Sequence, residues 1–377
     1  MDPQAIFRCV ETKSQWMRTS LRDLVRQESP SEDRSAVNAA NAMVEHIARD
    51  LNCRAKRHKQ KHFGDVLELK FGPVRSVKPV LLLGHLDTVW PSGTLKTMPW
   101  KEADGRYWGP GVLDMKAGVI MAITALKTLQ QLGLARPCTL LLNSDEEVGS
   151  PISRVISERL ALKSEAVFVL EPAQGLAYKT ARKGVGQYNV RVTGVGAHSG
   201  VDFEKGHSAV IELAKLVQTI SGFTNLERKL TVNCGVIAGG TRSNIVPSDA
   251  YTDVDVRIAK ANDAPYVETL FRRLKVSDPH CKLTITGGLN RPPMERKAGT
   301  IALFKKARRV AADLGFDLQE AATGGGSDGN FTAALGIPTL DGMGAVGEGA
   351  HAAHESVVIE HLVPRTALLA AMIASVG

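Results

Sequence analysis

The 377-residue sequence has neither a long apolar run nor a paired set of cysteines. No stretch approaches the roughly 18 uninterrupted apolar residues of a membrane-spanning helix, and the N-terminal segment lacks an apolar core followed by a cleavage site. The five cysteines are odd in number, scattered and free of CxxC pairs, which argues against a disulfide scaffold and a cysteine zinc site. We therefore expect a cytoplasmic protein without a membrane partner.

Aromatic residues are also scarce, at 5%, although the chain carries a net charge of +8. Nucleic-acid binding usually requires basic residues gathered on one face together with stacking aromatics. The basic residues are instead dispersed, except for the run RAKRHKQKH at 54–62. The sequence therefore predicts no nucleic-acid partner, and the charge suits a solvated surface or the attraction of small anionic substrates. A nucleic-acid-binding protein is the remote alternative, which salt-sensitive retention on DNA would reveal.

Glycine, with 35 residues, and apolar residues, with 44% of the chain, are by contrast well represented. A chain of this length can form two domains. Apolar strands alternate with amphipathic helices in the N-terminal half, which predicts an α/β domain with a mostly parallel sheet and helices on both faces. Helical spacing is present over 1–27, 34–52 and 115–133, and strands are expected over 66–71, 78–87, 138–144 and 166–172.

A different order of elements follows in the middle of the chain. Strand and helix patterns between 186 and 288 follow the order β-α-β-β-α-β, which is typical of a ferredoxin-like module. The α/β pattern then resumes, with helices expected over 299–314, up to 335 and over 361–376. We therefore predict an outer domain of residues 1–180 and 289–377, interrupted by a compact α+β domain of residues 181–288.

Metal-capable side chains occur at the expected strand ends and near the C-terminus of the outer domain. In open α/β sheets, ligands bind outside the carboxyl ends of the strands. A single aspartate there is usually a helix cap, and a single histidine is usually a satisfied polar residue. Convergence of several such segments favours a divalent metal site, with oxygen and nitrogen ligands that suit zinc, cobalt or manganese. The residues are His85, Asp87, Asp114, Asp145, Glu146, Glu147, Glu171, His351 and His354.

Eight short motifs carry a resemblance to a known family. They are GHLDTV, GPGVLDMKAG, SDEEVGS, VLEP, GAHSG, GGTRSNIVPSDA, TGGGSDGN and GAHAAHE. In motif order and spacing the sequence resembles the M20 metallopeptidases, from about residue 15 to its end, and is most similar to the glutamate carboxypeptidases. The family also contains acetylornithine and succinyl-diaminopimelate deacylases and the aminoacylases. The resemblance implies a zinc-peptidase-like catalytic domain with an inserted dimerisation or lid domain.

The resemblance also implies two zinc ions in each subunit, bridged by Asp114. The other implied ligands are His85, Glu147, Glu171 and His351. Asp87 would accept a hydrogen bond from the second ring nitrogen of His85 and fix its tautomer. Glu146, although adjacent to a ligand, would be the general base and acid. Asp145 matches no such role and is expected to be a cap or a loop residue.

Two histidines near the C-terminus compete for the last ligand position. The family pattern puts this ligand four residues before a glutamate, a spacing that His351 and Glu355 satisfy. We therefore predict that His351 is the ligand and that His354 lines the pocket or lies in solvent.

Residues of the inserted domain and of the segments after it complete the implied site. His198 would reach the active site of the partner in a homodimer and stabilise the tetrahedral oxyanion, unless it is a plain turn histidine. Asn244 would contact the reacting centre, and Arg291 would hold the free carboxylate of the substrate. Gly325, in the glycine run 324–326, would donate a backbone N–H group to that carboxylate, unless the run is only a capping turn.

The predicted activity is hydrolysis of the amide bond between a peptidyl or acyl group and an amino acid with a free carboxylate. A peptidase similar to the glutamate carboxypeptidases is the first expectation. An N-acyl-amino-acid deacylase of the acetylornithine or succinyl-diaminopimelate type is the alternative and uses the same groups. A catalytically silent binding or dimerisation module is a remote reading, which loss of Glu146 or of a ligand would favour, but the sequence retains them all.

Overall fold

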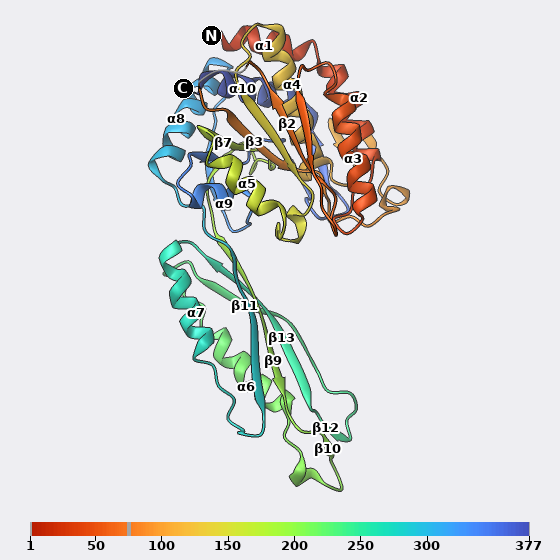
Figure 1. Ribbon diagram of the computed structural model, residues 1–377, viewed down its shortest axis with the longest axis vertical. Coiled ribbons are helices and arrows are strands. Elements are labelled where there is room, and N and C mark those ends of the chain that lie inside the picture. The colour runs from red at the N-terminus through yellow and green to blue at the C-terminus, as the bar shows by residue number, and fades with distance from the viewer. Residues whose placement is uncertain (1, 74–76, 377) are drawn as a thin grey trace. The chain divides into compact units, whose positions relative to one another are not determined.

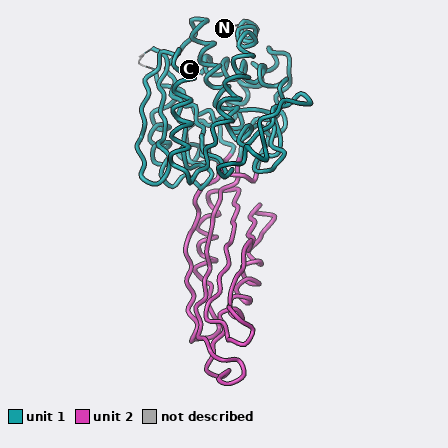
Figure 2. Tube along the Cα trace, turned by 90° about the vertical axis from the view of Figure 1, so that its right-hand side faces the viewer, with its two compact units in different colours: residues 1–181, 296–323, 327–377 teal, residues 182–295, 324–326 magenta. Residues whose placement is uncertain are grey.

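The computed structural model describes residues 2–73 and 77–376. The chain forms two compact units (Figure 2). Unit 1 contains residues 1–181, 296–323 and 327–377, and unit 2 contains residues 182–295 and 324–326. Among the described residues, no helix has both the length and the apolar character needed to cross a membrane.

Unit 1 is built on a six-stranded sheet (Figure 1). The strands, in their order across the sheet, are β1 Arg54–His58, β2 Val66–Phe71, β6 Cys138–Asn143, β3 Val80–His85, β7 Ala166–Val169 and β16 Thr339–Leu340. Strands β6, β3, β7 and β16 are parallel, whereas β1 and β2 are antiparallel additions at one edge. The predicted α/β fold with a mostly parallel sheet is thus confirmed.

Helices cover both faces of this sheet. They are α1 Pro3–Glu11, α2 Ser14–Arg26, α3 Arg34–Ile47, α4 Ala117–Gln131, α5 Ser153–Ala161, α8 Ala298–Asp313, α9 Gly329–Ala334 and α10 Leu362–Ser375. Successive residues of a strand point to opposite faces. In β3, Leu82 therefore packs in the large core that includes α4 and α10, whereas Leu81 and Leu83 pack in a smaller core with Ala161 of α5.

The helices differ from their predicted extents at several ends. The helical pattern predicted over 1–27 corresponds to two helices, Pro3–Glu11 and Ser14–Arg26, with a break at Thr12 and Lys13. The Thr12 hydroxyl donates to the carbonyl oxygen of Cys9 at 2.8 Å, a local bond that competes with continuation of the helix. The helix expected over 34–52 ends at Ile47.

A second sheet in unit 1 is antiparallel, with the order β17-β18-β5-β4. Its strands are β4 Lys101–Ala103, β5 Arg106–Trp108, β17 Gly347–Glu348 and β18 Ser356–Val358, and a separate pair is formed by β8 Tyr178–Arg182 and β15 Glu320–Thr323. The turn between β17 and β18 carries His351. This histidine therefore comes from a different sheet than His85 at the end of β3.

The basic run at 54–62 forms the edge strand β1 and the loop after it. Arg57 makes a two-pronged ion pair with Glu45, at 2.9 and 2.7 Å. Lys59 contacts Asp65 at 2.9 Å. Neighbouring carboxylates thus compensate part of this charge, and charged side chains also protect an edge strand from unwanted pairing.

Unit 2 has the ferredoxin-like architecture that the sequence predicts. Its elements are β9 Gly184–Thr193, α6 Ala209–Ser221, β11 Thr231–Gly239, β13 Asp249–Ile258, α7 Ala264–Arg272 and β14 Lys282–Arg291. The sheet is antiparallel with the order β11-β13-β9-β14. Tyr188, Val190 and Val192 on one face of β9 pack in a common core with α6 and α7, and Tyr188 stacks on Phe271 with 3.8 Å between ring centroids.

Gly118 in the first turn of α4 is predicted to be intolerant of a side chain. A Cβ atom there would lie 2.1 Å from the carbonyl oxygen of Leu170, directly before Glu171. We expect Gly118→Ala to lower the free energy of unfolding by about 1–3 kcal/mol, because backbone atoms must move to relieve the overlap. Urea-induced unfolding measures this change. Gly235→Ala in β11 is the control, since its Cβ would meet only the Asn233 amide, at 3.4 Å; an equal loss in both variants would contradict the prediction.

Candidate metal centre

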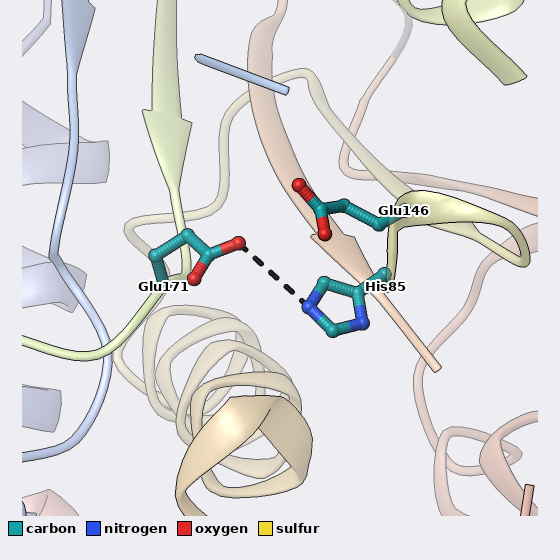
Figure 3. Close-up of side chains that lie close together, drawn as sticks. All are labelled: His85, Glu146 and Glu171. Atoms are coloured by element: carbon teal, nitrogen blue, oxygen red, sulfur yellow. Dashed lines mark ion pairs between the residues drawn. The ribbon is translucent and has the colours of Figure 1, made fainter. Parts of the chain in front are cut away.

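His85 ends β3 and lies among acidic side chains. The residue is 1% exposed. Its Nδ1 atom is 2.9 Å from the main-chain oxygen of Asp87, which fixes the orientation of the ring. Its Nε2 atom is 3.2 Å from Asp114 Oδ1. The same atom is 3.7 Å from Glu171 Oε1, the pair marked in Figure 3. The ring therefore directs one nitrogen at the backbone and the other at two carboxylates.

Asp114 divides its two carboxylate oxygens between two histidines. It lies in the irregular segment Val112–Lys116 that leads into α4. Oδ1 is 3.2 Å from His85 Nε2, and Oδ2 is 3.5 Å from His351 Nε2. A carboxylate placed in this way can bridge two metal ions.

His351, in the turn between β17 and β18, lies beside Asp114 and Glu147. Its Nε2 atom is 3.1 Å from Glu147 Oε2, in the short turn Glu146–Val148 that follows β6. The φ angle of His351 is 63°, in the left-handed region that residues other than glycine seldom adopt. Such conformations are concentrated at functional sites, where the surrounding structure maintains them.

Two sets of ligand atoms lie close enough to share an ion. One set comes from His85, Glu146 and Glu171, the other from His85, Asp114 and Glu147, and within each set the atoms lie within 4.8 Å of one another. Figure 3 shows that Glu146 and Glu171 approach the His85 ring from two different loops. All five predicted ligands therefore gather in unit 1, with Glu146 beside them.

Asp87 contacts His85 differently from the prediction. The main-chain oxygen accepts the hydrogen bond from Nδ1, and the carboxylate is 3.5 Å from that nitrogen. This carboxylate is fully buried and accepts from Ser31 Oγ at 2.8 Å and from the backbone N–H groups of Glu146 and Glu147 at 3.3 and 3.1 Å. Besides lying next to His85, Asp87 thus holds the turn that carries two acidic residues.

Asp145 is a cap, as expected for it. Its buried carboxylate accepts from the backbone N–H groups of Ile152 and Ser153, at 2.8 and 3.2 Å, where α5 begins. Burial raises the pKa of this carboxyl group.

Glu355 is a buried residue of this region whose contacts the sequence does not predict. Four donors surround its carboxylate, namely Trp90 Nε1 and the backbone N–H groups of Gly111, Leu113 and Asp114. Its spacing of four residues from His351 was the only signal in the sequence.

The pKa values of the candidate ligands are shifted because acidic side chains and histidines lie close together. Hydrogen bonds to Asp114 and Glu147 raise the pKa of His351 to about 10. Burial opposes ionisation of Asp114, but its contacts with His351 and His85 hold its pKa below the usual range. Burial raises the pKa of Glu147. Burial also disfavours the charged form of His85, but the neighbouring carboxylates outweigh it and place its pKa well above the usual value.

These residues fit divalent cations. Glu147 Oε1 is buried and has no hydrogen-bond partner among the described residues. A buried carboxylate oxygen without a partner is costly, and coordination to a metal satisfies it. Imidazole nitrogens and carboxylate oxygens together are ligands that zinc, manganese and cobalt accept.

Two of the predicted residues of unit 2 lie side by side on a small ribbon. Strand β10 Ala197–His198 pairs with β12 Ile245–Val246, and the N–H group of Ser199 donates to the carbonyl oxygen of Asn244 at 3.0 Å. His198 and Asn244 are both exposed. The ribbon follows the end of β9 (Figure 1).

The other two predicted residues of unit 2 also lie together. A Cβ atom on Gly326 would come within 2.9 Å of Arg291 Cδ, so a side chain there would displace the arginine. Arg182, which the sequence analysis did not single out, donates from Nη1 to the carbonyl oxygens of Gly325 and Gly326, at 3.2 Å each. Since Arg182 and Arg291 are both 5% exposed, the glycine run packs against two buried arginines.

Comparison with known proteins gives these residues a family context. Residues 81–375 match peptidase family M20/M25/M40. The chain belongs to this family. Carboxypeptidase G2 from Pseudomonas sp. (strain RS-16) is 29% identical to it over 363 residues, which cover 93% of this chain and 87% of that protein.

Solved structures of the M20 fold also superpose on the chain. Aminopeptidase PepT from Bacillus cereus does so with a TM-score of 0.79 and 21% identity, over 96% of this chain and 98% of its own. An M20 family metallo-carboxypeptidase from Sulfolobus solfataricus has a TM-score of 0.75 and 18% identity, over 95% of this chain and 98% of its own. These likenesses confirm the fold.

Membership of the M20 family makes the chain a hydrolytic peptidase. M20 metallopeptidases depend on metal, and the histidines and carboxylates of unit 1 are groups that could bind it.

The two C-terminal histidines of this M20 enzyme can be separated by metal binding. His354 is exposed and packs over Gly349, where a Cβ atom would be 2.8 Å from its Cδ2. We expect His351→Ala to weaken metal binding by more than the roughly 10–100-fold typical of losing an outer-shell residue. His354→Ala should leave both the stoichiometry and the affinity unchanged. Equilibrium dialysis with elemental analysis measures both, and the reverse pattern would show that His354 is the ligand.

Proposed function

We propose that this M20 enzyme is a di-zinc carboxypeptidase that removes a C-terminal amino acid with a free carboxylate, glutamate being preferred. The position of Asp114 carries the proposal, because its two oxygens face His85 and His351 separately. One carboxylate would then serve two ions, each with a histidine of its own. Glu171 lies beside His85, and Glu147 lies beside His351, so each ion also gains a further carboxylate.

Zinc ions held by these five residues would supply Lewis acidity to the scissile carbonyl group, and cobalt or manganese could replace them. The protein holds its ligands in place through contacts outside the ligand set. The main-chain oxygen of Asp87 orients His85, and the carboxylate of Asp87 holds the backbone of Glu147.

Glu146 is the proposed general base and acid. Its carboxylate groups with His85 and Glu171, although its neighbour Glu147 lies beside His351. In the first step a carboxylate oxygen of Glu146 would accept a proton from the attacking water. In the second step the same oxygen would deliver that proton to the leaving nitrogen.

The proposed preference for a free carboxylate rests on Arg291 and the glycine run. A planar guanidinium can donate two parallel hydrogen bonds to a carboxylate. Arg182 holds the carbonyl oxygens of Gly325 and Gly326, which keeps the run beside Arg291. The relative named carboxypeptidase G2 favours a carboxypeptidase over an N-acyl-amino-acid deacylase.

Hydrolysis of a substrate panel tests the proposed function. We expect the zinc-loaded protein to release C-terminal glutamate from peptides faster than other residues, and faster than it hydrolyses N-acetyl or N-succinyl amino acids. Glu146→Gln should lower kcat by about 10²–10⁴ with unchanged metal content, because it removes the proton acceptor. Glu158→Gln on α5, where Glu158 pairs with Arg154, is the control. Preference for the acyl amino acids would favour the deacylase, and no hydrolysis at all would overturn the proposal.

We also propose that the enzyme is a homodimer in which His198 acts in the partner's active site. In one copy of unit 2, Arg291 pairs with Val185 near the start of β9, whereas His198 follows the end of β9 at Thr193. The strand between Val185 and Thr193 spans roughly 26 Å, at about 3.3 Å per residue. A single small substrate cannot contact both groups of one copy, so a second copy would have to supply the histidine.

The tautomer of His198 suits this role. Its Nδ1 atom accepts a hydrogen bond from the N–H group of Gly200 at 3.1 Å. The neutral ring therefore carries its proton on Nε2, where it can be donated to a developing oxyanion. Asn244, directly before the adjacent strand β12, would contact the same reacting group.

The edge strand β11 supports the proposed dimer. It ends the sheet of unit 2, and its residues Val236 and Ile237 are 49% and 61% exposed. An exposed edge strand with apolar side chains is suited to pairing with another chain. At the end of β11, Gly239 lies against Val210 of α6, so the apolar area continues onto that helix.

Mixing two inactive variants tests the cross-subunit role. His198→Ala should lower kcat by the equivalent of about 2.7–4 kcal/mol, as for other oxyanion donors, with unchanged metal content. Mixing His198→Ala with Glu146→Gln protein should restore activity, because each mixed dimer has one site with an intact Glu146 and the partner's intact histidine. If both residues of a site came from one chain, every site would lack one of them. Absence of rescue despite confirmed subunit exchange would contradict the cross-subunit role and leave the metal chemistry unaffected.

A further inference from the structure

The buried carboxylate of Glu355 joins three loops that surround the candidate metal centre. Its Oε1 atom accepts from the backbone N–H groups of Leu113 and Asp114, at 2.8 and 3.0 Å. Its Oε2 atom accepts from the N–H group of Gly111 at 2.9 Å and from Trp90 Nε1 at 2.7 Å. A carboxylate offers about four acceptor positions, so these four donors use its capacity. Glu355 is thus saturated by hydrogen bonds, in contrast to Glu147.

The segment that presents Asp114 depends on this carboxylate. The N–H groups that precede a helix have no partner within it, and they require an acceptor from elsewhere. Asp114 itself has φ −113° and ψ 93°, outside the helical region, so the segment before α4 is not a regular turn. Glu355 supplies the acceptor for three of its N–H groups, including that of Asp114. The direction of the Asp114 side chain is therefore tied to Glu355.

The same residue is joined to the segment that presents His351. The N–H group of Glu355 donates to Ala352 at 2.9 Å, and that of Ala352 donates to Gly349 at 2.8 Å, so the turn around His351 is closed by its own backbone. Glu355 is the last residue of this turn before β18. Glu355 therefore contacts the Asp114 segment through its carboxylate and the His351 turn through its backbone.

Asp87 supports a different segment of the candidate metal centre, the turn that carries Glu146 and Glu147, in a similar way. Its buried carboxylate accepts from the backbone of Glu146 and Glu147, and the residue also orients His85. Each of these two buried carboxylates follows a histidine closely in the sequence and binds the backbone of a different acidic segment. Asp87 and Glu355 thus both bind the backbone of segments that carry candidate ligands, although only Asp87 belongs to a motif that pointed to such a role.

We propose that Glu355 is a positioning residue for metal binding, which sets the placement of Asp114 relative to His351 and so the affinity for both ions. This inference rests on the proposed function, in which Asp114 and His351 are ligands. Glutamine at this position would keep one acceptor oxygen, but its NH₂ group would face two N–H donors. The substitution therefore tests the carboxylate with little change of side-chain volume.

Zinc binding to the metal-free protein tests this proposal without an activity assay. Titration against a chromophoric chelator gives the stoichiometry and the affinity. Glu355→Gln should weaken binding of both ions by about 10–100-fold, the range typical of residues that support metal ligands. Glu348→Gln is the matched control, since Glu348 lies in the same hairpin with a 59% exposed side chain paired to Arg106. It should bind zinc as the wild type does.

Thermal unfolding of the metal-free variants separates positioning from a purely structural role. A Glu355→Gln protein that unfolds at a lower temperature but binds zinc with wild-type affinity would overturn the proposal. Should Glu355→Gln fail to fold, Trp90→Phe tests the proposal in its place. This substitution removes the indole N–H donor to Glu355 and keeps the three backbone N–H donors. Its zinc affinity should fall by less than about 10-fold but measurably, and an unchanged affinity would overturn the proposal.

The wild-type stoichiometry tests the proposed function separately. Binding of fewer than two ions would contradict the di-zinc site. Weaker binding in Glu355→Gln would still support the positioning role in that case.

Discussion

Crowding of carboxylates that have little exposure to solvent is the constraint on which the candidate metal centre of unit 1 depends. Asp114, Glu147 and Glu171 lie around two histidines, and Glu147 keeps a buried oxygen without a partner among the described residues. Negative charge in a buried space must be compensated by protons or cations. In accordance with this requirement, the neighbouring carboxylates raise the pKa of both His85 and His351.

The partners of each carboxylate separate candidate ligands from supporting residues. Asp87 and Glu355 are fully buried, and backbone N–H groups together with a side-chain donor occupy their oxygens. They stabilise the loops and have little capacity left for a cation. Residue type alone does not distinguish the two classes, since all are aspartates or glutamates.

The fold of unit 1 brings the candidate metal ligands together from two sheets. The parallel strands β3, β6 and β7 end side by side, so the residues after them share one edge. His351 arrives from the antiparallel sheet. In unit 2 the length of β9 separates the His198 ribbon from the arginines, and this separation is what a homodimer would overcome.

The sequence alone was sufficient for the fold class, the family resemblance and the residue types of the site, because alternating hydrophobic patterns and ordered motifs are local properties. It also predicted the ferredoxin-like module from the order of its strands and helices. It did not predict the break at Thr12, the contact of Asp87 with the backbone of Glu146, or the four donors around Glu355. The break at Thr12 involves a local bond from its hydroxyl to the carbonyl oxygen of Cys9. The contacts of Asp87 and Glu355 depend instead on which backbone N–H groups lie within hydrogen-bonding distance of a buried carboxylate, and only the packing of segments distant in the sequence decides that distance.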